Sequence, residues 1–277
     1  MSKYKLIALD LDGTLNNSNK EITQETKNAL MKIQENGIKL VLATGRPTPG
    51  LRREAKELNF EKYNGYLLSY NGARIDEYLS KNIFNQTLTI KEVQAVYDRF
   101  KKGYKLSIMS YQDTNLIAED GYGVRIHSEA QLNGMGVKLV DNLKDYIDFE
   151  PSKILFAADN DEYIATIEEE FKEPFKDSLS IYRSAPFYLE VMAKNVDKAK
   201  SLDFLAQKLG FTSNEIIAFG DGFNDLSMLE YAGVGIAMGN ADDEVKAKAN
   251  IITADNDSDG IAKALYKLFP DIFIDYQ

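Results

Sequence analysis

Short apolar runs that end in a polar residue are the strongest constraint on the fold of this chain. The segments "YKLIALD", "IKLVLATG" and "EIIAFGD" are apolar through their middle and reach a polar residue at Asp10, Thr44 and Asp221. A strand that is apolar on both faces must be covered on both faces, as in parallel sheets flanked by helices. Amphipathic helical patterns such as "TQETKNALMKIQENG" separate the runs. The sequence therefore predicts an α/β fold, with a Rossmann-like core around a mostly parallel sheet.

The pattern changes between residues 85 and 192, where several strand candidates follow one another. "KLSIMS" and "TNLIAE" are adjacent, and "SLSIYR" precedes "PFYLEVM". An irregular stretch containing glycine is predicted from Asp120 to about Asp148. Consecutive strands with fewer helices favour an antiparallel sheet backed by helices. We therefore predict an inserted α+β domain at residues 85–192, and a discontinuous core formed by residues 1–84 and 193–277.

Local signals mark the ends of several elements. Thr48 is expected to be the N-cap of a helix, with Pro49 at its first position. Thr89 and Glu92 have the spacing of a capping box. The pair Asn71–Gly72 between two apolar runs predicts a turn that joins antiparallel strands.

Composition excludes several functional classes. The 277 residues include 33 basic and 43 acidic side chains, for a net charge of −10, and the basic residues form no dense cluster. Nucleic-acid binding is therefore not expected. The chain has no cysteine, which rules out disulfides and thiolate chemistry. No apolar run approaches the roughly 20 residues that span a bilayer, so no membrane partner is expected and a cytoplasmic protein is predicted.

Acidic residues recur where the buried strands end. Asp10 and Asp12 follow the first strand, Thr44 ends the second, and Asp221 follows a later one. Ligands of open α/β sheets bind beyond the carboxyl ends of strands. Neighbouring carboxylates repel each other unless a cation lies between them, and a set of oxygen ligands suits Mg²⁺. Each "DG" pair read alone is a turn signal, but that reading does not explain why acids recur after buried strands.

Four ordered motifs resemble those of the haloacid dehalogenase (HAD) superfamily. They are "DLDGTL", "LATGR", the lysine of "NVDKAKSL" and "GDGFNDLSML". Within that superfamily the chain is similar to the Cof-type phosphatases, which carry an α+β cap between the second and third motifs. "SAPFYLEVM" and "EYAGVGIAMGNA" most resemble the YidA-like sugar-phosphatase branch. The resemblance covers nearly the whole chain and implies a cap that determines substrate specificity.

The resemblance implies a magnesium-dependent phosphomonoester hydrolase that acts on small phosphorylated metabolites, sugar phosphates in particular. Asp10 would be the nucleophile that forms an aspartyl-phosphate. Asp12, two residues further on and so on the same side of an extended chain, would be the general acid–base. Asp10, the main-chain carbonyl of Asp12 and Asp221 would hold Mg²⁺. Asp225 would support the metal and the lysine from behind.

The same resemblance implies a set of phosphate- or substrate-binding residues: Leu11, Thr44, Gly45, Arg46, Lys198 and Asn224. A cation in the first turn of a helix opposes the helix dipole, so the position of Lys198 breaks a local rule, as functional residues sometimes do. Lys200 is its rival. For Arg46, a place on the surface is an equal alternative to a contact with substrate.

Other positions remain undecided by the sequence. Phe223 stands in "GDGFND" where the family often has an acidic or polar residue, and Ala199 follows the lysine where glycine is common. Neither holds a reacting role, but Phe223 is placed to alter the edge of the pocket. His127, the sole histidine, is expected to be structural or at the surface, with contact to substrate as the alternative.

Three other functions compete with a phosphatase. A haloacid dehalogenase also uses an aspartate nucleophile, but it needs no Mg²⁺ and would leave Asp12 and Asp221 without a role. A phosphomutase needs an intermediate that resists water, whereas a base at Asp12 promotes hydrolysis. A non-catalytic phospho-acceptor or sugar-phosphate sensor would combine similar residues, but receiver domains are shorter and lack the "DLDGT" arrangement. The physiological substrate and the oligomeric state are left open.

Overall fold

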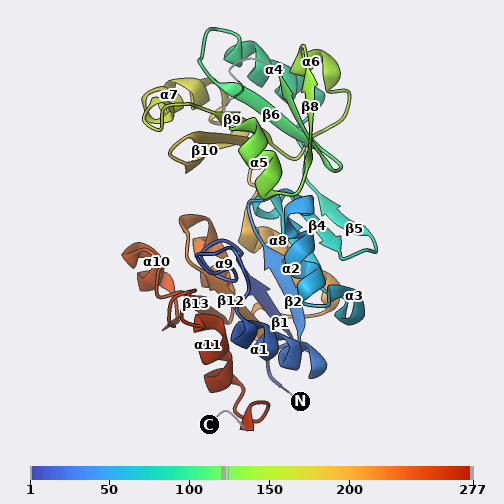
Figure 1. The fold of residues 1–277 in the computed structure, drawn as a ribbon, viewed down its shortest axis with the longest axis vertical. Coiled ribbons are helices and arrows are strands. Elements are labelled where there is room, and N and C mark those ends of the chain that lie inside the picture. Colours follow the sequence, from blue (N-terminus) through green and yellow to red (C-terminus); the bar gives the residue numbers. More distant parts are fainter. Residues whose placement is uncertain (1, 120–122, 124, 275–277) are drawn as a thin grey trace. The chain divides into compact units, whose positions relative to one another are not determined.

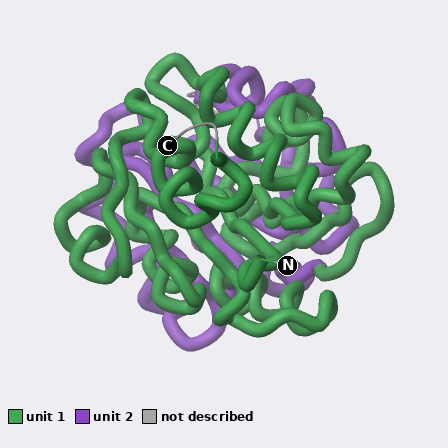
Figure 2. Tube along the Cα trace, turned by 90° about the horizontal axis from the view of Figure 1, so that it is seen from below, with its two compact units in different colours: residues 1–84, 197–277 green, residues 85–196 purple. Residues whose placement is uncertain are grey.

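The computed structural model describes residues 2–119, 123 and 125–274. The chain divides into two compact units, one formed by Met1–Phe84 together with Asp197–Gln277 and the other by Asn85–Val196 (Figure 2). Each unit has its own hydrophobic core. The first unit is therefore discontinuous in sequence, and the second is a single insertion into it.

The first unit is built on a mostly parallel sheet (Figure 1). Its strands are β1 (Leu6–Leu9), β2 (Lys39–Ala43), β3 (Tyr66–Ser69), β4 (Arg74–Glu77), β5 (Asn82–Asn85), β12 (Ile216–Gly220), β13 (Val234–Ala237) and β14 (Ile251–Ile252). Within the described residues their order is β14-β13-β12-β1-β2-β3-β4-β5. The pairs from β14 through β3 are parallel, and β3 pairs with β4 in the antiparallel sense. The predicted fold class is confirmed.

Helices cover both faces of this sheet. They are α1 (Gln24–Glu35), α2 (Arg52–Glu57), α3 (Phe60–Tyr63), α8 (Lys198–Leu209), α9 (Leu226–Tyr231), α10 (Asp243–Lys248) and α11 (Gly260–Leu268). Ile7 and Leu9 of β1 belong to a core that includes residues of α1, α2, α3 and α11, whereas Leu6 and Ala8 belong to one that includes residues of α8, α9 and α10. All four side chains of β1 are fully buried. Because each large apolar side chain contributes about 1.5–3 kcal/mol on burial, β1 is firmly held at the centre of the sheet.

The second unit has a mainly antiparallel sheet of β6 (Ser107–Gln112), β7 (Asn115–Glu119), β8 (Gly136–Val140), β9 (Ile154–Ala157), β10 (Leu179–Ala185) and β11 (Tyr188–Ala193). Among the described residues the order is β10-β11-β9-β6-β7-β8, and β7 and β8 run parallel. Its helices are α4 (Ile90–Phe100), α5 (Ile126–Leu132), α6 (Leu143–Tyr146) and α7 (Tyr163–Lys172). The apolar sides of α4, α6 and α7 share one core with the sheet, so this part is an α+β structure.

The prediction of an irregular stretch from Asp120 to Asp148 was wrong over its described part. That part contains α5, β8 and α6, and residues 120–122 and 124 lie outside the described residues. The sequence signals are weak for physical reasons. Helix α5 begins after Arg125 in a left-handed conformation with no side-chain cap. Strand β8 lies at the sheet edge and is largely exposed, so it lacks the alternation of a half-buried strand.

Two of the three local signals were correct. Thr89 and Glu92 form the reciprocal capping box at the start of α4. Asn71–Gly72 turns the chain between β3 and β4 with positive φ at both residues, 52° and 101°. The N-cap at Thr48 was wrong: Thr48 begins a 3₁₀ helix, Thr48–Leu51, and its hydroxyl shares a 2.8 Å hydrogen bond with the hydroxyl of Ser69. The Thr48 hydroxyl thus bonds to Ser69 at the end of β3 instead of capping the backbone of its own helix.

Candidate active site

The predicted site residues of the first unit gather beyond the carboxyl ends of β12, β1 and β2. These strands are neighbours in parallel register, with Leu9 of β1 opposite Leu42 and Phe219. The residues that follow them therefore emerge at the same edge of the sheet. Asp10 comes directly after β1 and Asp221 directly after β12.

A buried lysine joins two carboxylates at the centre of this edge. Lys198 Nζ lies 2.7 Å from Asp10 Oδ1 and 2.5 Å from Asp225 Oδ1, and the lysine side chain is fully buried. Burial alone would lower the pKa of Lys198, but Asp10 and Asp225 outweigh it and raise the pKa, so the lysine stays charged. Burial, reinforced by the charge of Asp225, raises the pKa of Asp10 well above its ordinary value despite Lys198.

The start of helix α8 places this lysine. Asp197 is the N-cap and accepts a hydrogen bond from the Lys200 amide at 3.0 Å. The helix dipole disfavours a cation at this end, but the two carboxylates compensate for it. Lys200 itself is exposed. The structure therefore places Lys198, and not its rival Lys200, in the acidic cluster.

Asp225 holds the loop that carries Asp221. One of its oxygens binds Lys198, and the other accepts hydrogen bonds from the amides of Asp221 and Gly222 at 3.1 and 3.0 Å. A side chain at Gly220 would lie 2.5 Å from the Asp225 Cβ, so glycine is needed for this close approach. Both oxygens of Asp225 are occupied by protein donors, which makes it a positioning residue.

Asp221 is held from the first motif. Thr14 Oγ1 donates a 2.6 Å hydrogen bond to Asp221 Oδ1. Gly13 has φ of +84°, and a Cβ there would lie 2.2 Å from Asp221 Oδ2. Burial raises the pKa of Asp221 to about 6, with a further increase from the charge of Asp225 and an opposing decrease from the Thr14 hydrogen bond.

The chemistry of this cluster fits a divalent cation. Among the described residues, one carboxylate oxygen from each of Asp10, Asp221 and Asp225 lies within 4.8 Å of the others. Three carboxylates lie near a single lysine, so negative charge is in excess. The pKa values of Asp10 and Asp221 are raised partly for this reason, in addition to burial. Oxygen ligands suit Mg²⁺. Because Asp225 is engaged elsewhere, Asp10 and Asp221 are the carboxylates available to a metal.

Asp12 has a different environment from Asp10. Arg46 donates to it twice, from Nε to Oδ2 at 2.7 Å and from Nη2 to Oδ1 at 2.5 Å, and Lys20 Nζ lies 3.0 Å from Oδ1. Partial burial would raise the pKa of Asp12, but these two cations outweigh it and lower the pKa. Arg46 is 9% exposed, so the alternative that it lies on the surface was wrong.

Backbone groups and amides border the same edge. Thr44 is buried; its hydroxyl accepts a hydrogen bond from the Arg46 amide at 3.2 Å, and its carbonyl accepts one from the Asn71 amide at 2.9 Å. Asn224 Nδ2 donates to Asn71 Oδ1 at 3.1 Å. A Cβ at Gly45 would lie 3.0 Å from Asn71 Nδ2, so a larger residue there would press on the Asn71 amide. The side chain of Leu11 is fully buried in the core, which leaves only its main chain for any ligand.

Sequence reasoning missed three residues of this site. Thr14 stands beside the two aspartates in "DLDGT", and a hydroxyl there was a usable signal. Asn71 was identified only as a turn residue, although the same loop brings its amide to Asn224. Lys20 had no local signal, because its contact with Asp12 depends on the path of the intervening loop.

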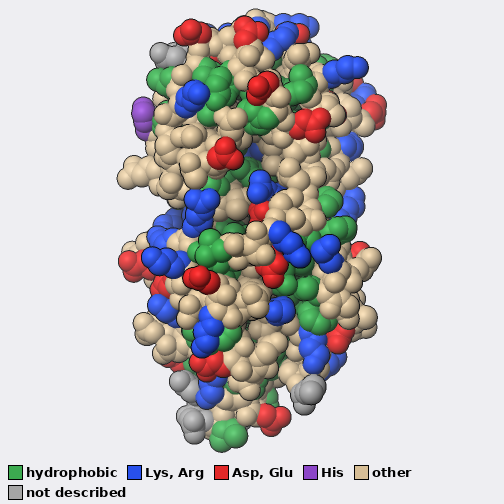
Figure 3. Space-filling view, turned by 90° about the vertical axis from the view of Figure 1, so that its right-hand side faces the viewer, with side chains coloured by type: hydrophobic (Ala, Val, Ile, Leu, Met, Phe, Trp, Pro, Cys, Tyr) green, Lys and Arg blue, Asp and Glu red, His purple; other side chains and the backbone are tan. Residues whose placement is uncertain are grey.

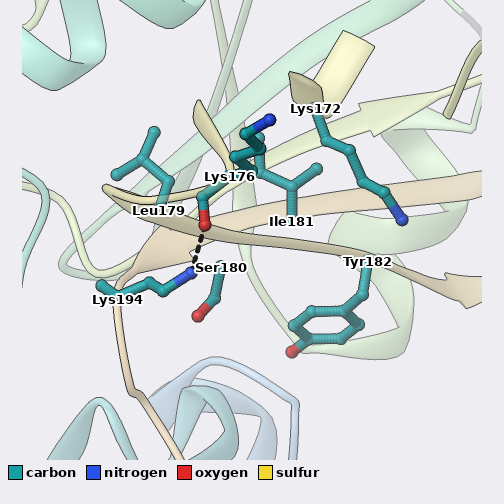
Figure 4. A pocket seen from close by; sticks show the side chains of 7 residues that line it. All are labelled: Lys172, Lys176, Leu179, Ser180, Ile181, Tyr182 and Lys194. Atoms are coloured by element: carbon teal, nitrogen blue, oxygen red, sulfur yellow. Dashed lines mark hydrogen bonds between the residues drawn. The ribbon is translucent and has the colours of Figure 1, made fainter. Parts of the chain in front are cut away.

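A groove of about 340 Å³ lies elsewhere, in the second unit. Its lining comes from the end of α7, Lys176, the edge strand β10 and Lys194 (Figure 4). Two of its lysines, Lys172 and Lys176, form ion pairs with Glu169 and Glu173. The groove has no acidic lining residue, so no aspartate of the cluster lines it.

Surface features add little to the assignment. His127 is exposed on α5. Figure 3 shows a face on which basic and acidic side chains are interspersed instead of being separated by sign. In the described part of the chain, every helix is too short or too polar to cross a membrane.

A mostly parallel α/β sheet with a buried Asp–Lys–Asp centre at its carboxyl edge defines the class of this protein: an α/β enzyme with an acidic centre suited to a cation. The chain belongs to the haloacid dehalogenase-like hydrolases, because the model of that family matches residues 7–265. The predicted family and the prediction of an enzyme are therefore confirmed.

Individual relatives agree with this family. A crystal structure of a haloacid dehalogenase-like hydrolase from Bacteroides thetaiotaomicron is 39% identical, with a TM-score of 0.90, covering 96% of this chain and 100% of that one. The HAD subclass IIB sugar phosphatase BT4131 is 28% identical, with a TM-score of 0.81 and coverage of 96% and 99%. The 5-amino-6-(5-phospho-D-ribitylamino)uracil phosphatase YcsE of Bacillus subtilis (strain 168) is 32% identical, with 94% of each chain covered.

Proposed function

We propose that this chain is a magnesium-dependent phosphatase that hydrolyses small phosphorylated metabolites, sugar phosphates among them, through an aspartyl-phosphate on Asp10. The observation that carries the proposal is the position of Asp10. It is buried at the end of β1, Lys198 binds one of its oxygens, and Asp221 lies beside it. The family of the chain and the names of relatives that act on phosphorylated compounds support the choice of substrate class.

In the first step, a carboxylate oxygen of Asp10 attacks phosphorus, and the bond from phosphorus to the leaving oxygen breaks. Lys198 orients Asp10 and opposes the rise in its pKa, so it favours the ionised carboxylate that attacks. Thr44 and the Gly45 amide would hold the phosphate oxygens. Asp12, in the protonated form that its lowered pKa makes the minor one, gives its proton to the leaving oxygen, which departs as an alcohol.

In the second step, Asp12 takes a proton from water, whose oxygen attacks phosphorus and releases Asp10 and inorganic phosphate. The ion pair with Arg46 favours the ionised form of Asp12 that this step needs. Asp10, the carbonyl of Asp12 and Asp221 would hold Mg²⁺, which when bound offsets the repulsion between the anionic carboxylate and the anionic phosphate. Asp225 fixes the loop from behind.

The second unit is proposed to act as the cap that determines which leaving group is accepted. Lids of this kind exclude water from a reacting centre and supply contacts to the part of the substrate that does not react. Its separate core supports an independent folding unit.

The direct test is phosphate release by the purified protein. We expect turnover of a generic phosphomonoester and of sugar phosphates with Mg²⁺, and loss of turnover when a chelator removes the metal. Release of phosphate at an undiminished rate in the chelator would contradict the proposal. Formation of an isomer of the substrate instead of free phosphate would favour a phosphomutase, and a phosphoenzyme that persists for minutes would favour a phospho-acceptor.

The requirement for Mg²⁺ is expected to depend on pH. The pKa of Asp221 is raised to about 6, so in the chelated protein this carboxyl carries a proton below that pH. Protons and Mg²⁺ then compete for it. The half-saturating Mg²⁺ concentration should rise by about tenfold or more for each pH unit below 6, and stay nearly level above it. Titrations of activity with Mg²⁺ across this range check the slope, and a level response would contradict the ligand role of Asp221.

Replacing Thr14 with Val is expected to weaken metal binding without removing a ligand. The change deletes the 2.6 Å hydrogen bond that stabilises ionised Asp221. Partners behind a metal ligand typically change metal affinity by about 10–100-fold, so the half-saturating Mg²⁺ concentration should rise by about that factor. Saturating Mg²⁺ should restore most of the activity. The matched control is Thr212→Val, whose hydroxyl binds Glu215 at an exposed turn.

A further inference from the structure

We infer that Lys20 makes this protein prefer phosphate esters whose alcohol part carries a carboxylate close to the ester oxygen. The inference rests on the proposed function and narrows its substrate class. Lys20 lies in the loop between β1 and α1. Its ammonium group lies 3.0 Å from Asp12 Oδ1, and its side chain is 53% exposed. Because Asp12 is proposed to give its proton to the leaving oxygen, the alcohol part of a substrate would meet this ammonium group next to Asp12.

Positive charge is in excess around Asp12. Arg46 binds both oxygens of this carboxylate, and Lys20 binds one of them again. Glu54, a buried carboxylate of α2, has a cation of its own in Arg53, at 2.6 Å. The two carboxylates therefore face three cations, whereas the aspartate cluster has more carboxylates than lysines. Arg46 is buried and Lys20 is exposed, so Lys20 is the cation that a substrate can reach.

The loop that carries Lys20 is held at several points. Lys20 has φ of +62°, a conformation that residues other than glycine seldom adopt. Its carbonyl accepts a hydrogen bond from Arg53 Nη2, and its amide donates to the Asn17 carbonyl at 2.9 Å. Asn16 is fully buried and donates to Glu54 at 3.0 Å. The main chain of Lys20 is thus fixed, so less freedom is lost on binding an anion than from a mobile loop.

The chemistry of the ammonium group favours a carboxylate over a hydroxyl. A lysine ammonium group has three N–H donors, and the bond to Asp12 uses one of them. Hydrogen bonds between two ionised groups are shorter and roughly twice as strong as those between neutral groups. A neutral polyol phosphate would offer this position only hydroxyl oxygens. An ester with a carboxylate one or two carbons beyond the ester carbon would offer a full negative charge.

3-Phosphoglycerate and glycerol 3-phosphate form a matched pair for the test, because they share the carbon count and the phosphate position and differ in one carboxylate. We expect the unaltered protein to have a kcat/KM about fivefold higher for the carboxylate ester, the upper end of the effect of one exposed charge pair. In Lys20→Met this ratio should fall to about one. The ratio is the decisive readout, because general damage to the site lowers both values together.

Salt separates charge recognition from shape. Raising the ionic strength from about 0.05 M to about 0.5 M should lower the ratio in the unaltered protein, because salt screens exposed charges. The ratio of Lys20→Met should not respond to salt. A role of Lys20 in the shape of the loop alone would leave the ratio independent of salt in both proteins, and that result would overturn the inference.

A second variant tests whether the loop aims this lysine. Arg53→Met removes the donor to the Lys20 carbonyl and should lower the ratio part of the way. Combined with Lys20→Met it should cause no further change in the ratio, because it acts through Lys20. The matched control is Lys27→Met, a lysine of α1 in the same unit whose ion pair with Glu57, at 3.2 Å, involves no residue of the site. It should keep the unaltered ratio.

The outcomes separate this inference from the proposed function. Equal kcat/KM for the two esters in the unaltered protein would overturn the inference, as would an unchanged ratio in Lys20→Met. Both results would leave the phosphatase itself in place, because phosphate is still released. If the unaltered protein released no phosphate from these esters or from acetyl phosphate with Mg²⁺, the proposed function itself would fail.

Discussion

Replacing Asp10 with Asn is expected to lower phosphate release by more than about a thousandfold, because the amide keeps the shape of the carboxylate but cannot attack phosphorus. The amide oxygen can still accept a hydrogen bond from Lys198, so the site should remain assembled. Rapid-quench mass spectrometry should find a phosphoryl group on the peptide containing Asp10 in the unaltered protein, and none in the variant.

Asp243→Asn provides the control for this experiment. Asp243 is a fully exposed carboxylate of α10 in the same unit, with a long 3.9 Å approach to Lys246. Its replacement removes the same charge from a side chain outside the aspartate cluster and should leave turnover unchanged. Undiminished turnover by Asp10→Asn, or a phosphoryl group trapped on another residue, would show that Asp10 is not the nucleophile.

Replacing Lys198 with Met should damage both activity and stability. The change leaves the buried carboxylates of Asp10 and Asp225 without their cation. Loss of one partner from a buried ion pair typically costs about 3–5 kcal/mol. The free energy of unfolding, measured with urea at about pH 7.5 in chelator, should fall by that amount. Turnover should fall by at least about a hundredfold.

The pH dependence separates charge from packing in this variant. Without the lysine, which opposes the raised pKa of Asp10, this carboxyl holds its proton still more tightly in the folded than in the unfolded chain, so the folded state gains stability as pH falls. The loss of stability in Lys198→Met, relative to the unaltered protein, should therefore become smaller as the pH is lowered to about 5. A second change, Asp225→Asn, removes one of the two unpaired carboxylates and should restore part of the stability but not the activity.

Lys200→Met is the matched control, because Lys200 is exposed two residues along the same helix. Its stability should stay within about 0.5 kcal/mol of the unaltered protein. If Lys198→Met were as stable as this control, the ion pairs of Lys198 would contribute little to the free energy of unfolding. If Lys198→Met lost the same amount of stability at about pH 7.5 and at about pH 5, lost packing and not unpaired charge would be the cause.

Strand content was predictable because it depends on local pattern. The apolar runs of β1, β2 and β12 are buried on both faces, and this requirement is visible in the sequence. The capping box at Thr89 is equally local. Elements without such patterns were missed, as β8 shows: it is an exposed edge strand, so no hydrophobic alternation was needed to form it.

The different environments of Asp10 and Asp12 were harder to predict from the sequence. Asp10 and Asp12 differ by two positions, yet the Asp10 side chain is 8% exposed beside Lys198, whereas the Asp12 side chain is 38% exposed beside Arg46 and Lys20. The pKa is raised at the first and lowered at the second. Long-range partners decide these shifts, and no local pattern records them.

By itself, the sequence determined the mostly parallel α/β core, the order of the four motifs and the acidic character of the strand ends. These follow from periodicity and residue type, which act over a few positions. Only the tertiary structure decided that Lys198 and not Lys200 joins the carboxylates, that Arg46 is buried against Asp12, and that Thr14 holds Asp221. Each of these contacts joins segments that lie far apart in the chain, so their formation depends on the strand order of the folded sheet.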